Sequence, residues 1–206
     1  MKNRAVAIIV FFVLLSLVAF YFDEVIVKAA SLMRNNFLDN FFMGLTYLSS
    51  EIIIFFILTS LFLWQERKRK WILPLWFTFF VSAFVSFLLK FIMQRQRPFQ
   101  IGIVQTLDIL RENSHLIWNF SFPSFQAMLA FCAIPILSKE FPKFKYAWTV
   151  FAVLVAFSRV YFGVHFLSDV IAGGLMGYLI GITVVKHEKE TKFWEKIYEK
   201  IKDRLR

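Results

Sequence analysis

The stretch FLSDVIAGGLMGYLIGITVV, Phe166 to Val185, decides the fold that this sequence predicts. It is apolar and close to the ~20 residues with which a helix crosses the hydrocarbon layer of a bilayer. One face of such a helix carries, at every fourth position, Asp169, Gly173, Gly177 and Gly181. Glycines at this spacing form a groove on which another helix can pack closely. The stretch therefore predicts a membrane helix inside a compact bundle.

Five further stretches come near the same length. Of the 206 residues 59% are hydrophobic, the mean hydropathy is +0.63, and 28 phenylalanines stand against seven glycines and five prolines. The core of a soluble domain cannot bury so much apolar surface, whereas the hydrocarbon layer of a bilayer can. The predicted spans are Ala5–Phe22, Leu45–Trp64, Trp71–Met93, Phe120–Leu137, Tyr146–Val164 and Phe166–Val185. The sequence thus predicts an all-α integral membrane bundle of six transmembrane helices.

The net charge of +10 comes from basic residues whose distribution along the chain is explained by membrane topology, so we expect no nucleic-acid partner. Seventeen basic residues lie at Lys2 and Arg4, from Arg67 to Lys70, at Lys139, Lys143 and Lys145, and from Lys186 onward. The loops between these sites hold six. Under the positive-inside rule the larger group is cytoplasmic, which places both termini inside. We expect a multi-pass protein of the cell membrane in which the outer ends of the third to sixth spans face the extracytoplasmic side.

The chain divides into a membrane domain, residues 1–185, and a basic tail, residues 186–206. One helical stripe of the tail carries Phe193, Trp194, Ile197, Tyr198, Ile201 and Leu205, with basic residues over the rest. This pattern predicts an amphipathic helix lying in the membrane interface against anionic lipid. A solvated, partly helical tail is the alternative. No repeat or Pro/Gly/Ser-rich linker divides the membrane domain further.

The segment from Asp23 to Ser50 joins the first two predicted spans. Its sequence is mixed and partly amphipathic, which predicts a short helix on the outer surface. A plain connecting loop is the alternative.

Two segments at the outer ends of predicted spans carry groups suited to an anion. Lys90 and Arg97 are seven residues apart, so they share one face of the third span, which Pro98 is expected to end. Two such cations can hold a phosphate, although they can also snorkel to the interface as simple anchors. Ser124 follows Pro123 at a predicted helix start, where free backbone N–H groups bind anions or are simply capped.

A third group of polar residues lies in SRVYFGVHFLSD, Ser158 to Asp169. Arg159 ends the predicted fifth span, and His165 and Asp169 lie one helical turn apart at the head of the sixth. An aspartate there can accept the imidazole N–H, fix the tautomer and leave the other ring nitrogen as a nucleophile or base. A structural histidine is the alternative, but the cations on the same membrane face favour a catalytic one.

These residues resemble the signature of the type 2 phosphatidic acid phosphatase superfamily. Its three parts are matched by Lys90 with Arg97-Pro98, by Pro123-Ser124, and by Ser158-Arg159 with His165 and Asp169. That superfamily includes integral-membrane lipid phosphatases and vanadium haloperoxidases. The resemblance covers the chain from about Leu45 to Gly181.

The resemblance implies phosphoryl transfer through a phosphohistidine, without metal or other cofactor. His165 would attack phosphorus and Asp169 would orient it. The groups that would hold the phosphate oxygens are Lys90, Arg97, Ser124 and Arg159.

The second part of the signature departs from the family pattern. The family has Pro-Ser-Gly-His where this chain has Pro123-Ser124-Phe125-Gln126. Phe125 keeps the backbone N–H that touches phosphate but lacks the freedom of glycine. Gln126 replaces the histidine that protonates the leaving oxygen, and an amide cannot donate that proton. His115 is the other histidine near this face and a candidate substitute.

Three functions are consistent with this reading. The first is a lipid phosphatase or diphosphatase, with a polyprenyl diphosphate favoured because a departing phosphate leaves without an acid. The second is a phosphotransferase that passes the phosphoryl group from His165 to another lipid or glycan. The third is a non-catalytic protein that binds phospholipid headgroups. The expected partners are a lipid phosphate or diphosphate and the bilayer.

Overall fold

The computed structural model describes residues 2–112 and 116–204. Helices joined by short turns make up these ranges, which contain no strand. The elements are α1 (Lys2–Leu32), α2 (Asn36–Leu48), α3 (Glu51–Trp64), η1 (Glu66–Trp71), α4 (Ile72–Met93), α5 (Asp108–Glu112), η2 (Leu116–Asn119), α6 (Phe125–Cys132), α7 (Ile134–Glu140), α8 (Phe144–Tyr161), α9 (Leu167–Thr191) and α10 (Phe193–Arg204).

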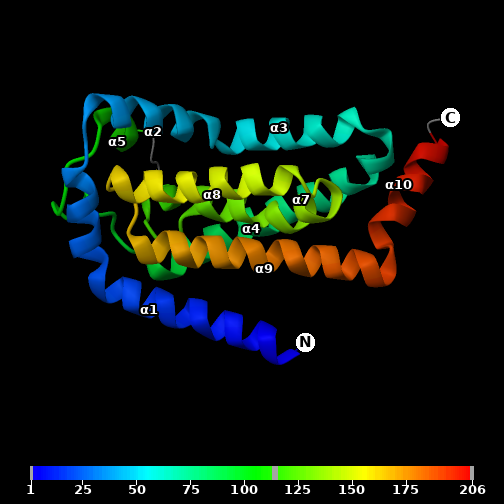
Figure 1. Ribbon diagram of the computed structural model, residues 1–206, viewed down its shortest axis with the longest axis horizontal. Coiled ribbons are helices and arrows are strands. Elements are labelled where there is room, and N and C mark those ends of the chain that lie inside the picture. The colour runs from blue at the N-terminus through cyan, green and yellow to red at the C-terminus, as the bar shows by residue number, and fades with distance from the viewer. Residues whose placement is uncertain (1, 113–115, 205–206) are drawn as a thin grey trace.

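The long helices lie side by side along one direction (Figure 1). Helices α4, α6, α7 and α8 form the middle, α2 and α3 lie along one side, and α9 separates the middle from α1. The tail helix α10 crosses one end of the bundle, while α2, α5 and the C-terminal part of α1 lie at the other. The all-helical prediction is confirmed for the described residues.

The glycine face of α9 is the packing surface that the sequence predicts. A Cβ on Gly173 would lie 2.5 Å from the carbonyl oxygen of Ser124, and one on Gly177 would overlap the carbonyl oxygen of Met128. Gly181 has the same relationship to Cys132. The backbone of α6 therefore lies directly against the backbone of α9. This contact fixes the position of Ser124 beside the start of α9.

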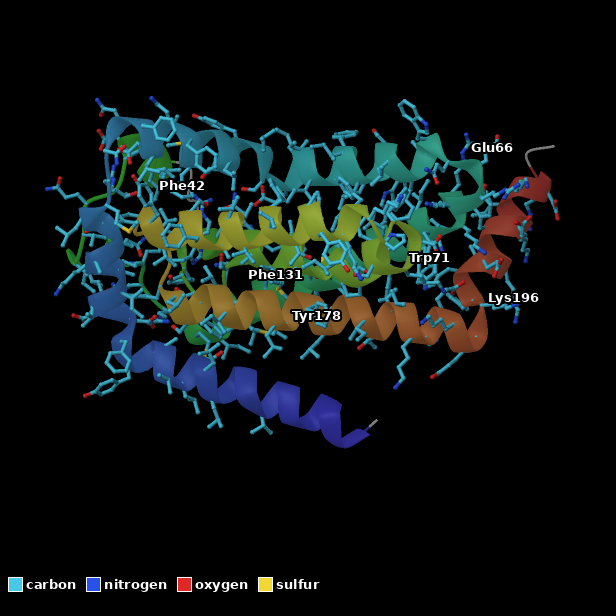
Figure 2. All side chains as sticks on the ribbon, in the orientation of Figure 1. Phe42, Glu66, Trp71, Phe131, Tyr178 and Lys196 are labelled. Carbon is cyan, nitrogen blue, oxygen red and sulfur yellow. The ribbon has the colours of Figure 1, made fainter. Side chains whose placement is uncertain are left out.

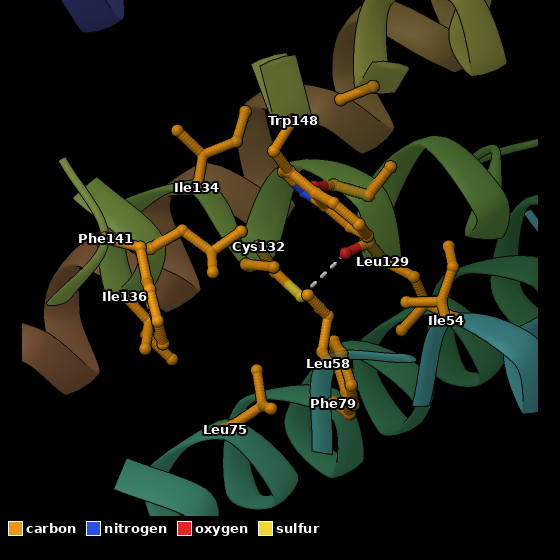
Figure 3. Close-up of a cluster of buried hydrophobic side chains, with 14 of the residues drawn as sticks. Ile54, Leu58, Leu75, Phe79, Leu129, Cys132, Ile134, Ile136, Phe141 and Trp148 are labelled. Atoms are coloured by element: carbon orange, nitrogen blue, oxygen red, sulfur yellow. Dashed lines mark hydrogen bonds between the residues drawn. The ribbon is translucent and has the colours of Figure 1, made fainter. Parts of the chain in front are cut away.

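An apolar cluster fills the bundle between the two ends (Figure 3). Leu58 of α3, Leu75 of α4 and Ile136 of α7 are fully buried in it. Cys132, the only cysteine of the chain, is buried among them and donates its thiol hydrogen to the Leu129 carbonyl oxygen at 3.2 Å. The cluster packs the middle of the molecule beneath the polar end.

Some of the helices, but not all of the predicted spans, are long and apolar enough to cross a bilayer. Among the described residues two helical runs, Glu66–Met93 and Leu167–Thr191, are long and apolar enough to cross a bilayer. The pair α2 and α3 qualifies as a third, although it bends by 63°. The predicted fourth span is divided into two short helices, α6 and α7. Six spans with cytoplasmic termini therefore stay a prediction.

The segment from Asp23 to Ser50 is helical, so the alternative of a plain loop is wrong. Helix α1 continues to Leu32, well beyond the predicted end of the first span, and α2 follows after a three-residue turn. The Phe42 ring of α2 packs on Phe157 and Tyr161 of α8, with centroids 5.5 and 4.7 Å away. This packing holds α2 over the polar end of the bundle.

The described part of the tail forms the predicted helix, α10, and specific contacts hold it to the bundle, while Leu205 of the predicted stripe lies outside the described residues. Helix α9 runs through the expected boundary at residue 185 and ends at Thr191, with Lys192 as its C-cap at a φ of +50°. The Glu188 carboxylate accepts from the backbone N–H of Trp194, whose ring lies 5.0 Å from Phe77 of α4. Figure 2 shows Lys196 of α10 at the same end of the molecule as Trp71. The division into two domains and the contact with anionic lipid stay predictions.

A surface ion pair also joins the tail helix to the bundle. Lys70 Nζ lies 2.7 Å from Glu195 Oε1. This hydrogen bond lowers the pKa of the Glu195 carboxyl below its usual value.

Candidate active site

A cavity of about 600 Å³ opens at the end of the bundle where α4 ends and α9 begins. The residues predicted from the sequence that line it are Lys90, Arg97, Phe125, Gln126, Arg159 and His165. Ser124 and Asp169 do not line it and are fully buried. Six of the eight predicted residues thus meet at one cavity, although they come from α4, the segment after it, α6, α8 and the turn before α9.

Lys90 and Arg97 reach the cavity, but not from one helical face as predicted. Helix α4 ends at Met93, because Gln94 takes a left-handed conformation with φ of +44° and caps the Lys90 carbonyl. Pro98 does not set this end, since proline restricts mainly the residue just before it. Lys90 is 1% exposed, and its Nζ donates to the Phe120 carbonyl oxygen at 2.5 Å.

Arg97 is held by backbone acceptors from two segments. Its guanidinium donates to the carbonyl oxygens of Trp118 at 2.8 Å, Asn119 at 3.0 Å and Val164 at 3.1 Å. Burial lowers the pKa of Arg97 to about 10, so the side chain stays charged at neutral pH. These bonds tie the segment after α4 to the turn before His165.

The segment Ser124-Phe125-Gln126 begins α6. Ser124 is the N-cap, so Pro123 precedes the helix and does not lie in its first turn as predicted. The backbone N–H of Ser124 donates to the Asp169 carbonyl oxygen at 3.1 Å. Its Oγ is buried and has no hydrogen-bond partner among the described residues. The Phe125 ring packs against Trp118, with centroids 5.0 Å apart. The first backbone N–H groups of α6 are unpaired within the helix and are available to an anion.

Arg159 lies at the end of α8 as predicted and contacts Gln126 directly. Its Nη1 donates to the Gln126 side-chain oxygen, and Nη2 donates to Thr46 Oγ1 at 3.1 Å. A guanidinium only donates, so this contact orients the Gln126 amide with its oxygen toward Arg159 and its NH₂ group away from it. Nε of Arg159 is buried without a partner in the described part of the chain.

His165 lies in the turn before α9, which corrects the prediction that it shares a helical face with Asp169. The helix begins at Leu167, with Phe166 as its N-cap. His165 Nδ1 lies 3.7 Å from Asp169 Oδ2 and 3.4 Å from Ser121 Oγ. Because Nδ1 faces these groups, Nε2 is on the opposite side of the ring.

The charge state of His165 suits a nucleophile. Burial, reinforced by the positive charge of Arg97, lowers the pKa of His165 to about 3. The imidazole is therefore neutral at pH 7 and keeps a lone pair on one nitrogen.

Asp169 is held by contacts that were not predicted from the sequence. Its Oδ2 accepts from the backbone N–H of Phe166 at 2.8 Å and from the Ser121 hydroxyl. Its Oδ1 lies 2.6 Å from Nη1 of Arg95, whose Nη2 in turn lies 2.8 Å from Asp23 Oδ2 on α1. Both carboxylates are buried, at 0% and 3% side-chain exposure.

Ser168 closes this group of residues, which we call the Asp23–Arg95–Asp169 network. Its backbone N–H donates to Asp23 Oδ1 at 2.9 Å, and its hydroxyl accepts from Arg95 Nη1 at 2.8 Å. The Arg95 guanidinium also lies 4.0 Å from the Phe166 ring centroid. One signal in the sequence could have drawn attention to Asp23, because an aspartate at the end of an apolar run is costly unless it is paired.

His115, the candidate substitute acid, lies outside the described residues. Among those that are described, no three His, Cys, Asp or Glu side chains group as metal ligands would. The arrangement brings three cations and a neutral imidazole to one cavity. Such a site can bind a phosphoryl group and attack it.

Comparison with known proteins agrees with the signature. Residues 71–192 match the PAP2 superfamily. Phosphatidylglycerophosphatase B of Bacillus subtilis is 32% identical over 183 residues, which cover 82% of this chain and 85% of that protein. An undecaprenyl-diphosphatase of Sulfolobus acidocaldarius is 33% identical over 131 residues, 63% of this chain and 61% of its own length. The crystal structure of a transmembrane PAP2-type phosphatidylglycerolphosphate phosphatase from Bacillus subtilis has a TM-score of 0.72 and 27% identity over 91% of this chain and 97% of that one.

Proposed function

The chain belongs to the PAP2 superfamily and is a phosphoric ester hydrolase, and on this premise we propose that it hydrolyses a lipid diphosphate through a phosphohistidine at His165. One observation carries the proposal: the cavity joins a neutral imidazole to the cations Lys90, Arg97 and Arg159. A phosphoryl group has the charge that such a set of cations stabilises.

In the first step the lone pair of His165 Nε2 attacks phosphorus. The bond from phosphorus to the leaving oxygen breaks, and the departing group keeps that electron pair. Three cations offset the charge that spreads over the equatorial oxygens. The Ser124 hydroxyl and Arg159 Nε, both buried without described partners, are available as further donors.

Asp169 and Ser121 support this step from the other side of the ring. The Asp169 carboxylate is 3.7 Å from Nδ1, longer than a hydrogen bond, and a small shift of the ring shortens this distance. An Nδ1–H donating to Asp169 keeps the lone pair on Nε2. The carboxylate also stabilises the positive charge that the ring gains on phosphorylation.

Gln126 supports a diphosphate as the substrate. Its amide NH₂ can donate a hydrogen bond to a leaving oxygen but cannot transfer a proton. A departing lipid phosphate has a pKa of about 6 and needs no proton, whereas the alkoxide from a monophosphate does. Of the two relatives compared, one is named as an undecaprenyl-diphosphatase and the other as a phosphatidylglycerophosphatase, so both kinds of leaving group occur among similar proteins.

The distribution of basic residues supports a site on the extracytoplasmic side of the cell membrane. Seventeen lysines and arginines lie in the segments predicted to be cytoplasmic, against six in the loops predicted to lie outside. A cysteine placed at Gln105, an exposed position between α4 and α5, should react with an impermeant thiol reagent in intact cells, and one at Gln65 should not. The reverse pattern would overturn the orientation.

Phosphate release from a panel of lipids tests the activity itself. The purified protein in detergent, with a metal chelator present, should release phosphate from polyprenyl diphosphate faster than from a monophosphate with the same tail. Activity that disappears with chelator and returns with a divalent metal would contradict the metal-independent mechanism. Equal rates on both lipids would contradict the substrate.

A further inference from the structure

The cavity that holds His165 also contains a carboxyl group. Glu51 lines it from the first turn of α3, and it is the one acidic residue among the described residues of the lining. Its side chain is exposed, and no ion pair or hydrogen bond joins it to a described side chain. Its charge lies within electrostatic range of the Arg159 guanidinium.

The bend between α2 and α3 brings Glu51 to this place. The two helices meet at 63° around Ser49 and Ser50. On the α2 side of the bend Thr46 accepts from Arg159, which fixes the bend against the end of α8. Glu51 begins the next helix and lines the same cavity as Gln126 and His165. The fold therefore presents a carboxylate to the cavity where Gln126 supplies only an amide.

The second half of the proposed reaction has a requirement that Gln126 cannot meet. To release phosphate, a water molecule must attack the phosphohistidine, and it must lose a proton as it does so. An amide cannot accept that proton. A carboxylate can, and a positioned general base typically contributes about 10²–10⁴-fold to such a step.

We propose that Glu51 is the general base of phosphohistidine hydrolysis, an inference that rests on the proposed function. The water oxygen bonds to phosphorus while one of its protons passes to the Glu51 carboxylate. The bond from phosphorus to Nε2 breaks, and its electron pair returns to the His165 ring. Glu51 then releases the proton to solvent, which its exposed position permits. This role favours water over a lipid phosphate as acceptor, because a phosphate needs no base.

A structural role for Glu51 predicts something different. A carboxylate in the first turn stabilises a helix by interacting favourably with the helix dipole. Replacing it for that reason alone would change thermal stability slightly and would leave the balance between the two half-reactions untouched. The amount of phosphoenzyme during turnover therefore separates the two roles.

The experiment quenches full-length protein during turnover of a lipid diphosphate and measures acid-labile phosphate on the protein. Glu51→Gln should turn over about 10²-fold more slowly than the wild type and should accumulate the phosphoenzyme. Hydroxylamine, a nucleophile that attacks without prior deprotonation, should restore turnover of this variant. Glu51→Asp, which keeps the carboxylate, should fall between the two. Glu24→Gln, an exposed carboxylate of α1 outside the cavity lining, should behave as the wild type.

The outcomes separate the inference from the function on which it rests. Unchanged turnover in Glu51→Gln, or slower turnover without phosphoenzyme accumulation, would overturn the role of Glu51. An active wild type that forms no phosphohistidine under any condition would instead overturn the proposed function. If Glu51→Gln does not fold, as judged by thermal unfolding, the ratio of phosphoenzyme to turnover in Glu51→Asp decides the matter in the same way.

Discussion

Arg95 and Asp169 form a buried ion pair in which Nη1 and Oδ1 are 2.6 Å apart. Arg95 is not one of the signature residues, yet it connects the Asp169 carboxylate to Asp23 of α1. This relationship makes the first helix part of the support of the candidate site. Contacts behind a catalytic group usually determine how well it is oriented.

Arg95→Ala should destabilise the protein and lower its activity. The substitution leaves the buried carboxylates of Asp23 and Asp169 without their partner, which typically costs about 3–5 kcal/mol. The milder Asp23→Asn should fold and reduce kcat about 10²-fold with little change in KM, since it misplaces Asp169 without touching substrate. Lys28→Ala, which removes an exposed ion pair on the same helix, is the control and should change stability by less than about 0.5 kcal/mol. If Asp23→Asn raised KM and left kcat intact, the network would not act through Asp169.

Gly177→Ala and Gly44→Ala should have opposite effects on stability. A Cβ on Gly177 overlaps the Met128 carbonyl, so the variant should lose about 1–3 kcal/mol by overpacking. Gly44, within α2, has open space at that position, so alanine should stabilise it by up to about 1 kcal/mol through helix propensity. Thermal unfolding in detergent measures both. Similar shifts in the two variants would mean that α6 does not lie on the α9 groove.

The sequence predicts this groove because a four-residue spacing of glycines depends only on local helix geometry. For the same reason it predicts Arg159 at the end of α8. It fails where segments that are distant in the chain meet. Thr46 on α2 contacts Arg159, and Asp23 on α1 contacts Arg95, only after the bundle has formed. A pattern read along one segment holds no information on such contacts.

Helix ends are the other place where the sequence prediction differs from the structure. Lys90 and Arg97 were expected on one face, but the left-handed Gln94 ends α4 first. Glutamine gives no signal of a stop, whereas glycine or asparagine would. His165 was expected on the sixth helix, and it precedes the N-cap Phe166. In both cases the signature residues line the cavity, although they do not lie on the helical faces that were predicted for them.

Stability should depend on pH through His165. The unfolded histidine titrates near 6.5, while burial lowers the folded pKa to about 3, so the unfolded chain binds a proton that the folded chain does not. The stability from this residue is therefore fully present above pH 6.5 and is lost as the pH falls toward 3. Between pH 6 and 4 the wild type should lose up to about 1.4 kcal/mol per pH unit more than His165→Gln. Parallel unfolding curves for the two proteins would show that the folded histidine is charged.

Gln126→His should change the preference between substrates. A histidine at this position can protonate a leaving alkoxide, so monophosphate turnover should rise by about 10²-fold or more while diphosphate turnover changes little. Gln126→Asn is the control, because it shortens the amide without adding an acid. The ratio of the two rates, measured on lipids with the same tail, reports the effect. A wild-type protein that hydrolyses monophosphates as fast as diphosphates would show that another group supplies the proton.

The most direct test of the account is the location of phosphate on the protein during turnover. A rapid acid-free quench followed by peptide mass spectrometry should find phosphohistidine at residue 165 in the wild type. Neither His165→Ala nor unreacted protein should carry it, and His165→Ala should have no turnover. Phosphate on a different residue, or turnover that survives in His165→Ala, would contradict the assignment of His165 as the nucleophile.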